Sequence, residues 1–440
     1  MPPAPPPVPI PVLGDLLPLW SVVPFAVMLL AIALMPLVAP GRWERNSLKA
    51  GFSLLLGAPV AIWVGWIEPG AVLHAVREYF AFILLLGALF VVAAGIVVRG
   101  TLAGTPGTNT VLLAVGAVLA SFIGTTGASI LLVRPLLRAN SVRVRKAHVF
   151  VFFTFVVANC GGLLTPLGDP PLFLGFLRGV PFTWTLRLWK EWLLVNGVLL
   201  ILFYIVDSTL FRREDIERGV DLDQVAVEHQ EPIHIAGKRN VLYLAGIVAV
   251  LLASGGLDLP AVAQSAGILA LLALSWFTTP KALHVENGFS WHPILEVAAL
   301  FAGIFATMIP ALAILNARGA ALGLVHPWHY FWASGLLSSF LDNAPSYLAF
   351  ASAASGSLGT DAADLRQLLA HPHGEMLLVA ISLGSVLMGA NTYVGNGPNF
   401  MVKAIAERGG VRMPGFFGYM GYSAAILLPL FAVVTWAFLL

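Results

Sequence analysis

Two aspartates interrupt long apolar stretches of this 440-residue chain. Asp342 lies beside Asn343 in the stretch 327–355, and Asp169 lies in the stretch 147–180. A charged carboxylate near the centre of a bilayer costs about 2.5–3.5 kcal/mol on insertion scales, so such an acid is a functional candidate by default. Burial in an apolar medium favours the protonated form of a carboxyl group, whereas a bound Na⁺ favours the ionised form. Both aspartates are therefore candidate sites for a proton or a small cation.

Helix capping is the alternative explanation for both aspartates. Asp169 precedes Pro170 and Pro171, and Asp followed by Pro suits the start of a helix. Asp342 could cap the second arm of its own stretch. The two roles are compatible, since a capping carboxylate can also bind an ion.

Four apolar stretches, 109–138, 147–180, 327–355 and 375–407, are broken by Gly, Pro and small polar residues. Unpaired backbone in hydrocarbon costs several kcal/mol per group, so it survives only where protein or a water-filled cavity satisfies it. The helix ends at such breaks carry partial charges that can hold an anion, a cation or both. A kink made only for packing is the alternative, but breaks at matching places favour a site. Candidate ion- or substrate-binding residues are Asp342, Asn343, Asp169, Asn159, Asn396, Asn391, Thr125, Thr126, Ser129, Ser346 and Thr392, with Asp342 and Asp169 as candidate Na⁺ ligands.

The elements that must position these residues are membrane-spanning helices. Hydrophobic residues make up 58% of the chain and charged residues 10%, with a mean hydropathy of +0.88. Soluble domains average about 45–50% and 25%, so a water-soluble enzyme, a disordered protein and a nucleic-acid binder are excluded. No Walker A sequence supports ATP-driven transport. Uninterrupted apolar runs long enough to span a bilayer lie at about 17–39, 48–67, 79–98, 188–211, 239–256, 261–278, 293–316 and 414–440.

The positive charges indicate that 109–138 and 327–355 are re-entrant hairpins. With both as hairpins and the N-terminus outside, seventeen Lys and Arg residues fall on the cytoplasmic face and six on the other, with Arg134 set aside inside an arm. Each half of the chain is then predicted to contain three spans, a hairpin, a broken span and a final span. The two halves have opposite orientations in the membrane. The sequence predicts an all-α polytopic membrane protein with two inverted-topology repeats, about 10 spans and 2 hairpins, as in secondary transporters.

Four segments follow from this organisation. We expect a Pro-rich N-terminal tail at 1–16, a first repeat at 17–211, a cytoplasmic linker at 212–238 and a second repeat at 239–440.

Three further residues, Arg134, Asp207 and Cys160, carry polar or reactive groups in or near apolar stretches. Arg134 is explained by snorkelling to the cytoplasmic interface or by a role as counter-ion to an aspartate. Asp207, near the end of its run, is expected at the membrane interface. Cys160 is the one cysteine, which excludes an intramolecular disulfide and Cys-based zinc or iron–sulfur sites.

Two motifs resemble those of a known family. Asp342-Asn343-Ala344-Pro345 resembles the Asp-Asn-x-Pro element of NhaD-type sodium/proton antiporters, and Thr165-Pro166-Leu167-Gly168-Asp169 is similar to their Ser-Pro-Ile-Gly-Asp element. The segments 124–140 and 389–404 resemble a subgroup linked to citrate transport or sodium:proton antiport. Both groups belong to the ion transporter superfamily. The resemblance implies a scaffold, a mobile domain and a homodimer, with Na⁺ and H⁺ as transported or coupling ions.

We expect a non-enzymatic sodium/proton antiporter of the bacterial inner membrane. Asp342 would be the primary exchange site and Asp169 the second, with oxygens of Asn343, Thr126, Asn159 and Asn396 completing the cation shell. The alternative is a symporter that couples a cation to citrate, a dicarboxylate or another anion. The dicarboxylate branch of the superfamily has Ser-Asn-Thr at both hairpin tips, whereas this chain has Gly-Thr-Thr-Gly and Asp-Asn. The expected partners are the lipid bilayer and small ions or small carboxylates, with no nucleic acid and no cofactor.

The hairpin prediction is testable by thiol labelling. The loops at 138–147 and 212–240 should face the cytoplasm, and those at 180–187 and 357–374 the outside. In a Cys160→Ala background, Ser141→Cys should resist an impermeant maleimide added to intact cells, whereas Thr360→Cys should react. Labelling of Ser141→Cys from outside would reject the hairpin.

Overall fold

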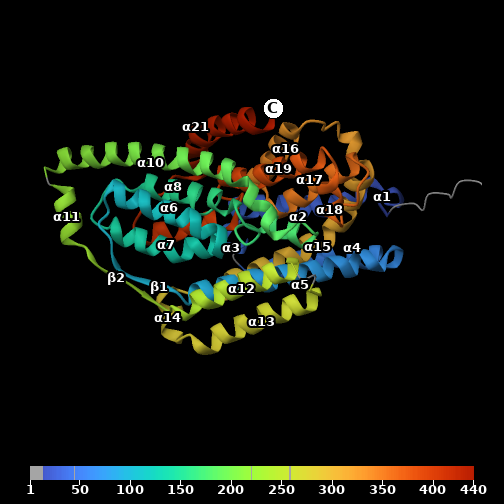
Figure 1. Ribbon diagram of the computed structural model, residues 1–440, viewed down its shortest axis with the longest axis horizontal. Helices are drawn as coiled ribbons and strands as arrows, with labels where there is room; N and C mark the ends of the chain where they lie inside the picture. Colours follow the sequence, from blue (N-terminus) through green and yellow to red (C-terminus); the bar gives the residue numbers. More distant parts are fainter. Residues whose placement is uncertain (1–12, 44, 220, 257–258) are drawn as a thin grey trace, which may run out of the picture.

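The computed structural model describes residues 13–43, 45–219, 221–256 and 259–440, and nearly all of its regular structure is helical (Figure 1). Within these ranges, 9 helices are long and apolar enough to cross a membrane. Shorter apolar helices lie at Ala147–Leu163 and Arg239–Ser254. The all-α polytopic membrane fold predicted from the sequence is therefore confirmed.

The first half of the chain contains both of the broken elements predicted for it. Its elements are α1 (Leu13–Leu16), η1 (Leu19–Val22), α2 (Val23–Val38), α3 (Pro40–Trp43), α4 (Asn46–Ile67), α5 (Pro69–Ala94), β1 (Val97–Thr101), α6 (Pro106–Ile123), α7 (Thr125–Ala139), α8 (Ala147–Val156), η2 (Cys160–Leu163), α9 (Pro170–Leu177), η3 (Phe182–Leu188) and α10 (Trp189–Arg218). Helices α6 and α7 are the two arms of the first predicted hairpin, and α8, η2 and α9 form the broken span. Most of the predicted tail lies outside the described residues, and its end forms α1.

The second half repeats this order of elements. It contains α11 (Leu222–Glu228), β2 (Glu231–Ala236), α12 (Arg239–Gly256), α13 (Ala261–Thr278), α14 (Lys281–Glu286), α15 (His292–Arg318), η4 (Gly319–Leu322), α16 (Pro327–Phe340), α17 (Asn343–Ser357), α18 (Leu365–Ala370), α19 (Gly374–Leu387), η5 (Met388–Asn391), α20 (Gly397–Arg408), α21 (Phe416–Val434) and a final π-helical turn η6 (Thr435–Leu439). The arms α16 and α17 and the broken helix α19–η5–α20 follow three longer helices, as in the first half. The opposite membrane orientation of the two halves stays a prediction.

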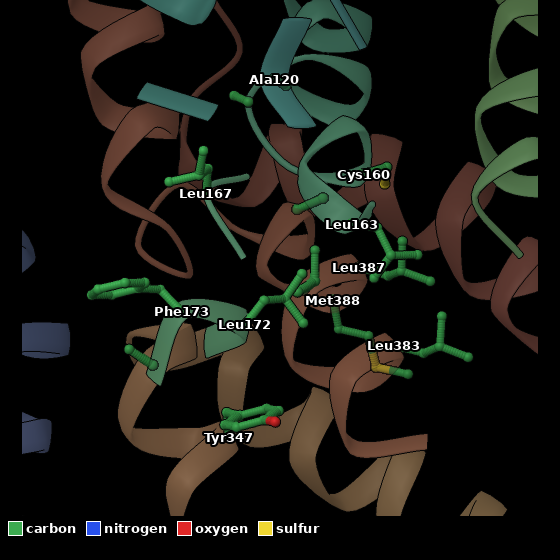
Figure 2. Packing of buried hydrophobic residues seen from close by; sticks show 14 of the residues in the cluster. Ala120, Cys160, Leu163, Leu167, Leu172, Phe173, Tyr347, Leu383, Leu387 and Met388 are labelled. Atoms are coloured by element: carbon green, nitrogen blue, oxygen red, sulfur yellow. The ribbon is translucent and has the colours of Figure 1, made fainter. Parts of the chain in front are cut away.

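We distinguish two sets of helices, which also pack on each other where α15 contacts α17 and α5 contacts α7. The first, which we call the frame group, comprises α2, α4, α5, α12, α13 and α15, where α15 packs on α4 and α5, and α13 packs on α5 and α12. The second, which we call the site group, comprises the arms and broken helices α6–α9, α16, α17, α19 and α20. In Figure 1, α12 and α13 lie at the opposite side of the molecule from α16 and α19. Leu172 and Phe173 of α9 pack in one apolar cluster with Leu387 and Met388 of the second half, which joins the two broken helices (Figure 2).

A buried ion pair connects the two groups. Arg178, which caps the C-terminus of α9, donates from Nε and Nη2 to the carboxylate of Glu78 in α5 at 2.7 and 3.0 Å. Both side chains are at most 6% exposed. Among the described residues, this is the one ion pair between the frame group and the site group.

A two-stranded sheet was not predicted. β2 lies in the predicted linker and pairs antiparallel with β1, with Val97 opposite Ala236. Arg138, at the end of hairpin arm α7, donates to the carbonyl oxygens of Val98 and Gly100 at 2.6 and 3.2 Å. The linker is therefore attached to the end of the first hairpin through β1. Pairing across more than 130 residues of chain has no local sequence signal.

Asp207 was expected at the membrane interface, and its depth in the membrane stays a prediction; the structure adds that its side chain is covered by protein. Its side chain is fully buried in α10, where Oδ1 lies 2.5 Å from Nη2 of Arg143 and 2.7 Å from Nε2 of His148. Asn109 of α6 donates to Oδ2 at 3.1 Å. The carboxylate can stay buried because Arg143 supplies the opposite charge and Asn109 an additional hydrogen bond. This cluster ties the base of the first hairpin to α8 and α10.

Removing the charge of Asp207 should destabilise the protein strongly. Asp207→Asn leaves Arg143 buried without a counter-charge, which costs about 3–5 kcal/mol. Glu217→Gln is the control, since Glu217 pairs with Arg145 at the surface, where the pair contributes at most about 1 kcal/mol. The thermal unfolding midpoint of each purified variant in detergent measures the difference. Equal midpoints for the two variants would contradict the stabilising role of the Asp207 cluster.

Candidate functional site

Four helices begin at one point between the two halves of the chain. Asp169 occupies the N-cap of α9 and Asn396 the N-cap of α20, while Thr125 and Asn343 are the first residues of α7 and α17. Thr125 Oγ1 donates to Asp169 Oδ1 at 3.1 Å, and Asn396 Nδ2 lies 3.3 Å from the same oxygen. Asn343 Nδ2 donates to Asp169 Oδ2. The carboxylate of Asp169 thus contacts side chains from the starts of the other three helices.

Local sequence explains why helices begin here. Gly124 separates α6 from α7 with φ +79°, a conformation that a residue with a side chain rarely adopts. Pro170 begins α9 and Pro398 is the second residue of α20, and proline suits the first turn because its missing N–H would have no helical partner. Each break therefore ends one helix and starts the next beside the site.

The surroundings of Asp169 suit a bound cation or proton. The residue is 1% exposed, and no Lys, Arg or His in the described ranges forms an ion pair with it or with Asp342. Its side chain makes no capping bond to α9, so both carboxylate oxygens are directed to the site rather than to the helix backbone. The Oδ1 atom of Asn343 is buried and has no hydrogen-bond partner among the described residues. A free amide oxygen beside a carboxylate is a suitable pair of ligands for a hard monovalent cation.

Asp342 has a different environment. It is half-buried, and its Oδ1 accepts a hydrogen bond from the backbone N–H of Ala344 at 3.2 Å. It therefore caps α17, which is the structural role considered for it from the sequence. Asp342 thus lies at one of the four helix starts, but among the described residues no hydrogen bond joins its carboxylate to the side chains that contact Asp169.

Asn159 links the two broken helices. Its Oδ1 accepts from Asn396 Nδ2 at 3.1 Å, and its Nδ2 donates to Asn399 Oδ1 at 2.7 Å. Asn399 in turn donates to the carbonyl oxygens of Gly389 and Thr392, both at 2.9 Å. The sequence places Asn399 among the polar residues of this break, but it was not included with the candidate binding residues; its position one turn after Asn396 is the signal that favours it. This chain of amides holds Asn396 against Asp169.

The other predicted residues lie around this centre. Thr126 is half-buried next to Thr125, and Ser129 is buried with an Oγ that has no partner among the described residues. Ser346 Oγ donates to the carbonyl oxygen of Asp342 at 3.0 Å. Asn391 and Thr392 both contact Ser339, at its Oγ (2.9 Å) and its carbonyl oxygen (2.5 Å). Among the described residues, none of these side chains donates a hydrogen bond to Asp169.

Arg134 is not brought to either aspartate. Its guanidinium lies against Gly288, between α14 and α15. It is nine residues from Thr125 along α7, or roughly 14 Å along a helix axis. Among the described residues, no ion pair or hydrogen bond joins Arg134 to an aspartate, so its expected role as a counter-ion has no support in the structure.

Loss of the Asn159 amide should weaken ion binding without preventing insertion. Asn159→Ala removes the acceptor that holds Asn396 beside Asp169, so we expect the apparent affinity for the transported ion to fall several-fold in reconstituted vesicles. Asn196→Ala is the control, because Asn196 is also buried and bonded to the carbonyl oxygen of Cys160, but does not contact Asn396 or Asp169. Unchanged affinity in Asn159→Ala would reduce Asn159 to a local support for unwound backbone.

Comparison with known proteins identifies the family of this chain. No curated protein matches the chain. The model of a family described as "Putative citrate transport" matches residues 14–439, nearly the whole sequence. With its membrane-spanning helices, the chain is a membrane transporter that belongs to this family.

Proposed function

We propose that the protein is a secondary active transporter that exchanges Na⁺ for H⁺ at Asp169. The observation that carries this proposal is a buried carboxylate with donors from three other helix starts and no ion-pair partner among the described residues. Such a group is electrically neutral when it holds either a proton or a monovalent cation. If only the neutral forms cross between the two sides, one ion leaves whenever the other is carried back.

The contacts favour Asp169 over Asp342 as the exchange site. From the sequence, Asp342 was expected to be the primary site because it lies at the tip of a predicted hairpin. Yet Asp342 uses Oδ1 to cap α17, whereas Asp169 makes no capping bond and faces the unpartnered Oδ1 of Asn343. We therefore propose Asp169 and Asn343 as the principal ligands, with Asp342 adding negative charge nearby.

A second candidate function is cation-coupled uptake of citrate or another carboxylate. The family description favours it, and so do the four helix N-termini, whose partial positive charges attract anions. However, the donors of Thr125, Asn343 and Asn396 are already directed to Asp169. A substrate carboxylate would have to displace Asp169 from these donors, so we place cation exchange first.

Flux measurements in proteoliposomes separate the two functions. Addition of Na⁺ should collapse an imposed pH gradient in the absence of any organic anion if the protein exchanges cations. Uptake of labelled citrate that requires Na⁺ or H⁺, with no collapse by Na⁺ alone, would favour the symporter. From the positive charges we further propose an N-terminus outside a bacterial inner membrane.

The two aspartates should respond differently to the loss of charge. Asp169→Asn keeps the size of the side chain but removes the titratable group, and should reduce Na⁺-driven proton flux to the level of empty vesicles. Asp342→Asn should keep most of the flux, since Asn caps a helix as well as Asp does. The same proteoliposome assay, at equal protein content, measures both. Loss of flux in Asp342→Asn together with normal flux in Asp169→Asn would overturn the assignment of Asp169.

A further inference from the structure

The two broken helices share a short sequence repeat. Residues 165–171 read Thr-Pro-Leu-Gly-Asp-Pro-Pro and residues 392–398 read Thr-Tyr-Val-Gly-Asn-Gly-Pro, with Thr, Gly and the last Pro at the same places. The hairpin tips likewise begin with Ser121-Phe122-Ile123 and Ser339-Phe340-Leu341. In this alignment Asp169 corresponds to Asn396.

The repeated residues make repeated contacts. Thr165 Oγ1 donates to the carbonyl oxygen of Ser121, and Thr392 Oγ1 donates to that of Ser339. Each threonine Oγ1 also accepts from the backbone N–H two residues later, at 3.2 and 3.1 Å. The hydroxyl groups of the two serines donate to equivalent carbonyl oxygens in the unwound segments η2 and η5. The two halves of the site are therefore built alike, down to individual hydrogen bonds.

Asp169 and Asn396 have matching backbones as well. Asp169 has φ −146° and ψ 143°, and Asn396 has φ −151° and ψ 138°. Neither side chain caps its own helix, and the two side chains meet, with Asn396 Nδ2 3.3 Å from Asp169 Oδ1. The chemical difference between these two equivalent positions is one carboxylate against one amide.

We propose that the ion-binding carboxylate can function at either position 169 or position 396. Because position 396 carries an amide, the pair of positions holds one carboxylate instead of two. This inference rests on the proposed exchange at Asp169. It makes Asn396 a specificity-determining residue, because its neutrality sets how many protons or monovalent cations the pair of positions can hold.

Asn159 explains why position 396 carries the amide. Its Oδ1 faces Asn396 Nδ2 at 3.1 Å, and a carboxylate at position 396 would present an acceptor to an acceptor. The residue that corresponds to Asn159 in the other half is Val386, which has no polar atom in its side chain. A carboxylate is thus accommodated at position 169 and opposed at position 396, so exchange from position 396 should work with weaker ion affinity.

The test is to move the carboxylate between the two positions. Asp169→Asn alone should be inactive, and the double variant Asp169→Asn/Asn396→Asp should regain Na⁺-driven proton flux, with at least one-tenth of the wild-type rate and a higher half-saturating Na⁺ concentration. Asp169→Asn/Asn399→Asp is the matched control, since position 399 is buried nearby but does not contact Asp169, and it should stay inactive. All variants are purified as the full chain and compared at equal amounts of monodisperse protein.

A double variant that is monodisperse yet as inactive as Asp169→Asn overturns the proposal, as does equal recovery in the Asn399→Asp control. If the double variant is not monodisperse, Asn396→Asp alone decides. Two carboxylates about 3 Å apart share a proton, so the pH dependence of its flux should differ from that of the wild type. An unchanged profile overturns the proposal. Failure of the exchange function itself looks different, because then the wild type shows no Na⁺-driven flux or Asp169→Asn retains it.

Discussion

The arrangement at the centre of this protein depends on one constraint, which is that the buried carboxylate of Asp169 has no basic partner among the described residues. An unpaired charge is expensive in a membrane, and Asp169 meets that cost with side-chain donors and with the positive ends of four helices. Four helices can begin at one point only if four apolar stretches are interrupted there. Gly124 and the prolines that follow Asp169 and Asn396 provide three of these interruptions. The hairpins and broken helices can thus be understood as consequences of placing one acid.

Other buried acids of the protein show the contrast. Asp207 is paired with Arg143, and Glu78 with Arg178, each through two hydrogen bonds. Those pairs are neutral within the protein and bind one helix to another. Among the described residues Asp169 has neutral donors only, so its charge stays available for the exchanged ion that we propose. Asp207 and Glu78 thus differ from Asp169 by the presence of an arginine rather than by burial.

The sequence is sufficient to predict much of this architecture. Apolar run length identifies the long helices, because it is a local property that the bilayer imposes. The breaks between α6 and α7 and between α16 and α17 lie where the sequence predicts them, whereas the re-entrant course inferred from Lys and Arg stays a prediction. The sequence also identifies Asp169, Asn159, Asn343 and Asn396 as candidates, since polar residues at helix breaks are few. Which of them touch is decided by packing between distant segments, as between Asn159 and Asn396. For the same reason the burial of Asp207 and the pairing of β1 with β2 could not be read from neighbouring residues.

The ion pair between Glu78 and Arg178 has a consequence for any relative movement of the frame and site groups. Separating two buried charges is prohibitive if either is left in hydrocarbon, but inexpensive if both enter water as they part. Arg178 also donates from Nη1 to the carbonyl oxygen of Ala362, which is a further contact that such a separation would break. Any relative movement of the two groups must therefore either keep Glu78 and Arg178 together or bring both charges into water at the same time. The pair acts as a pivot for the first kind of movement and as a barrier to the second.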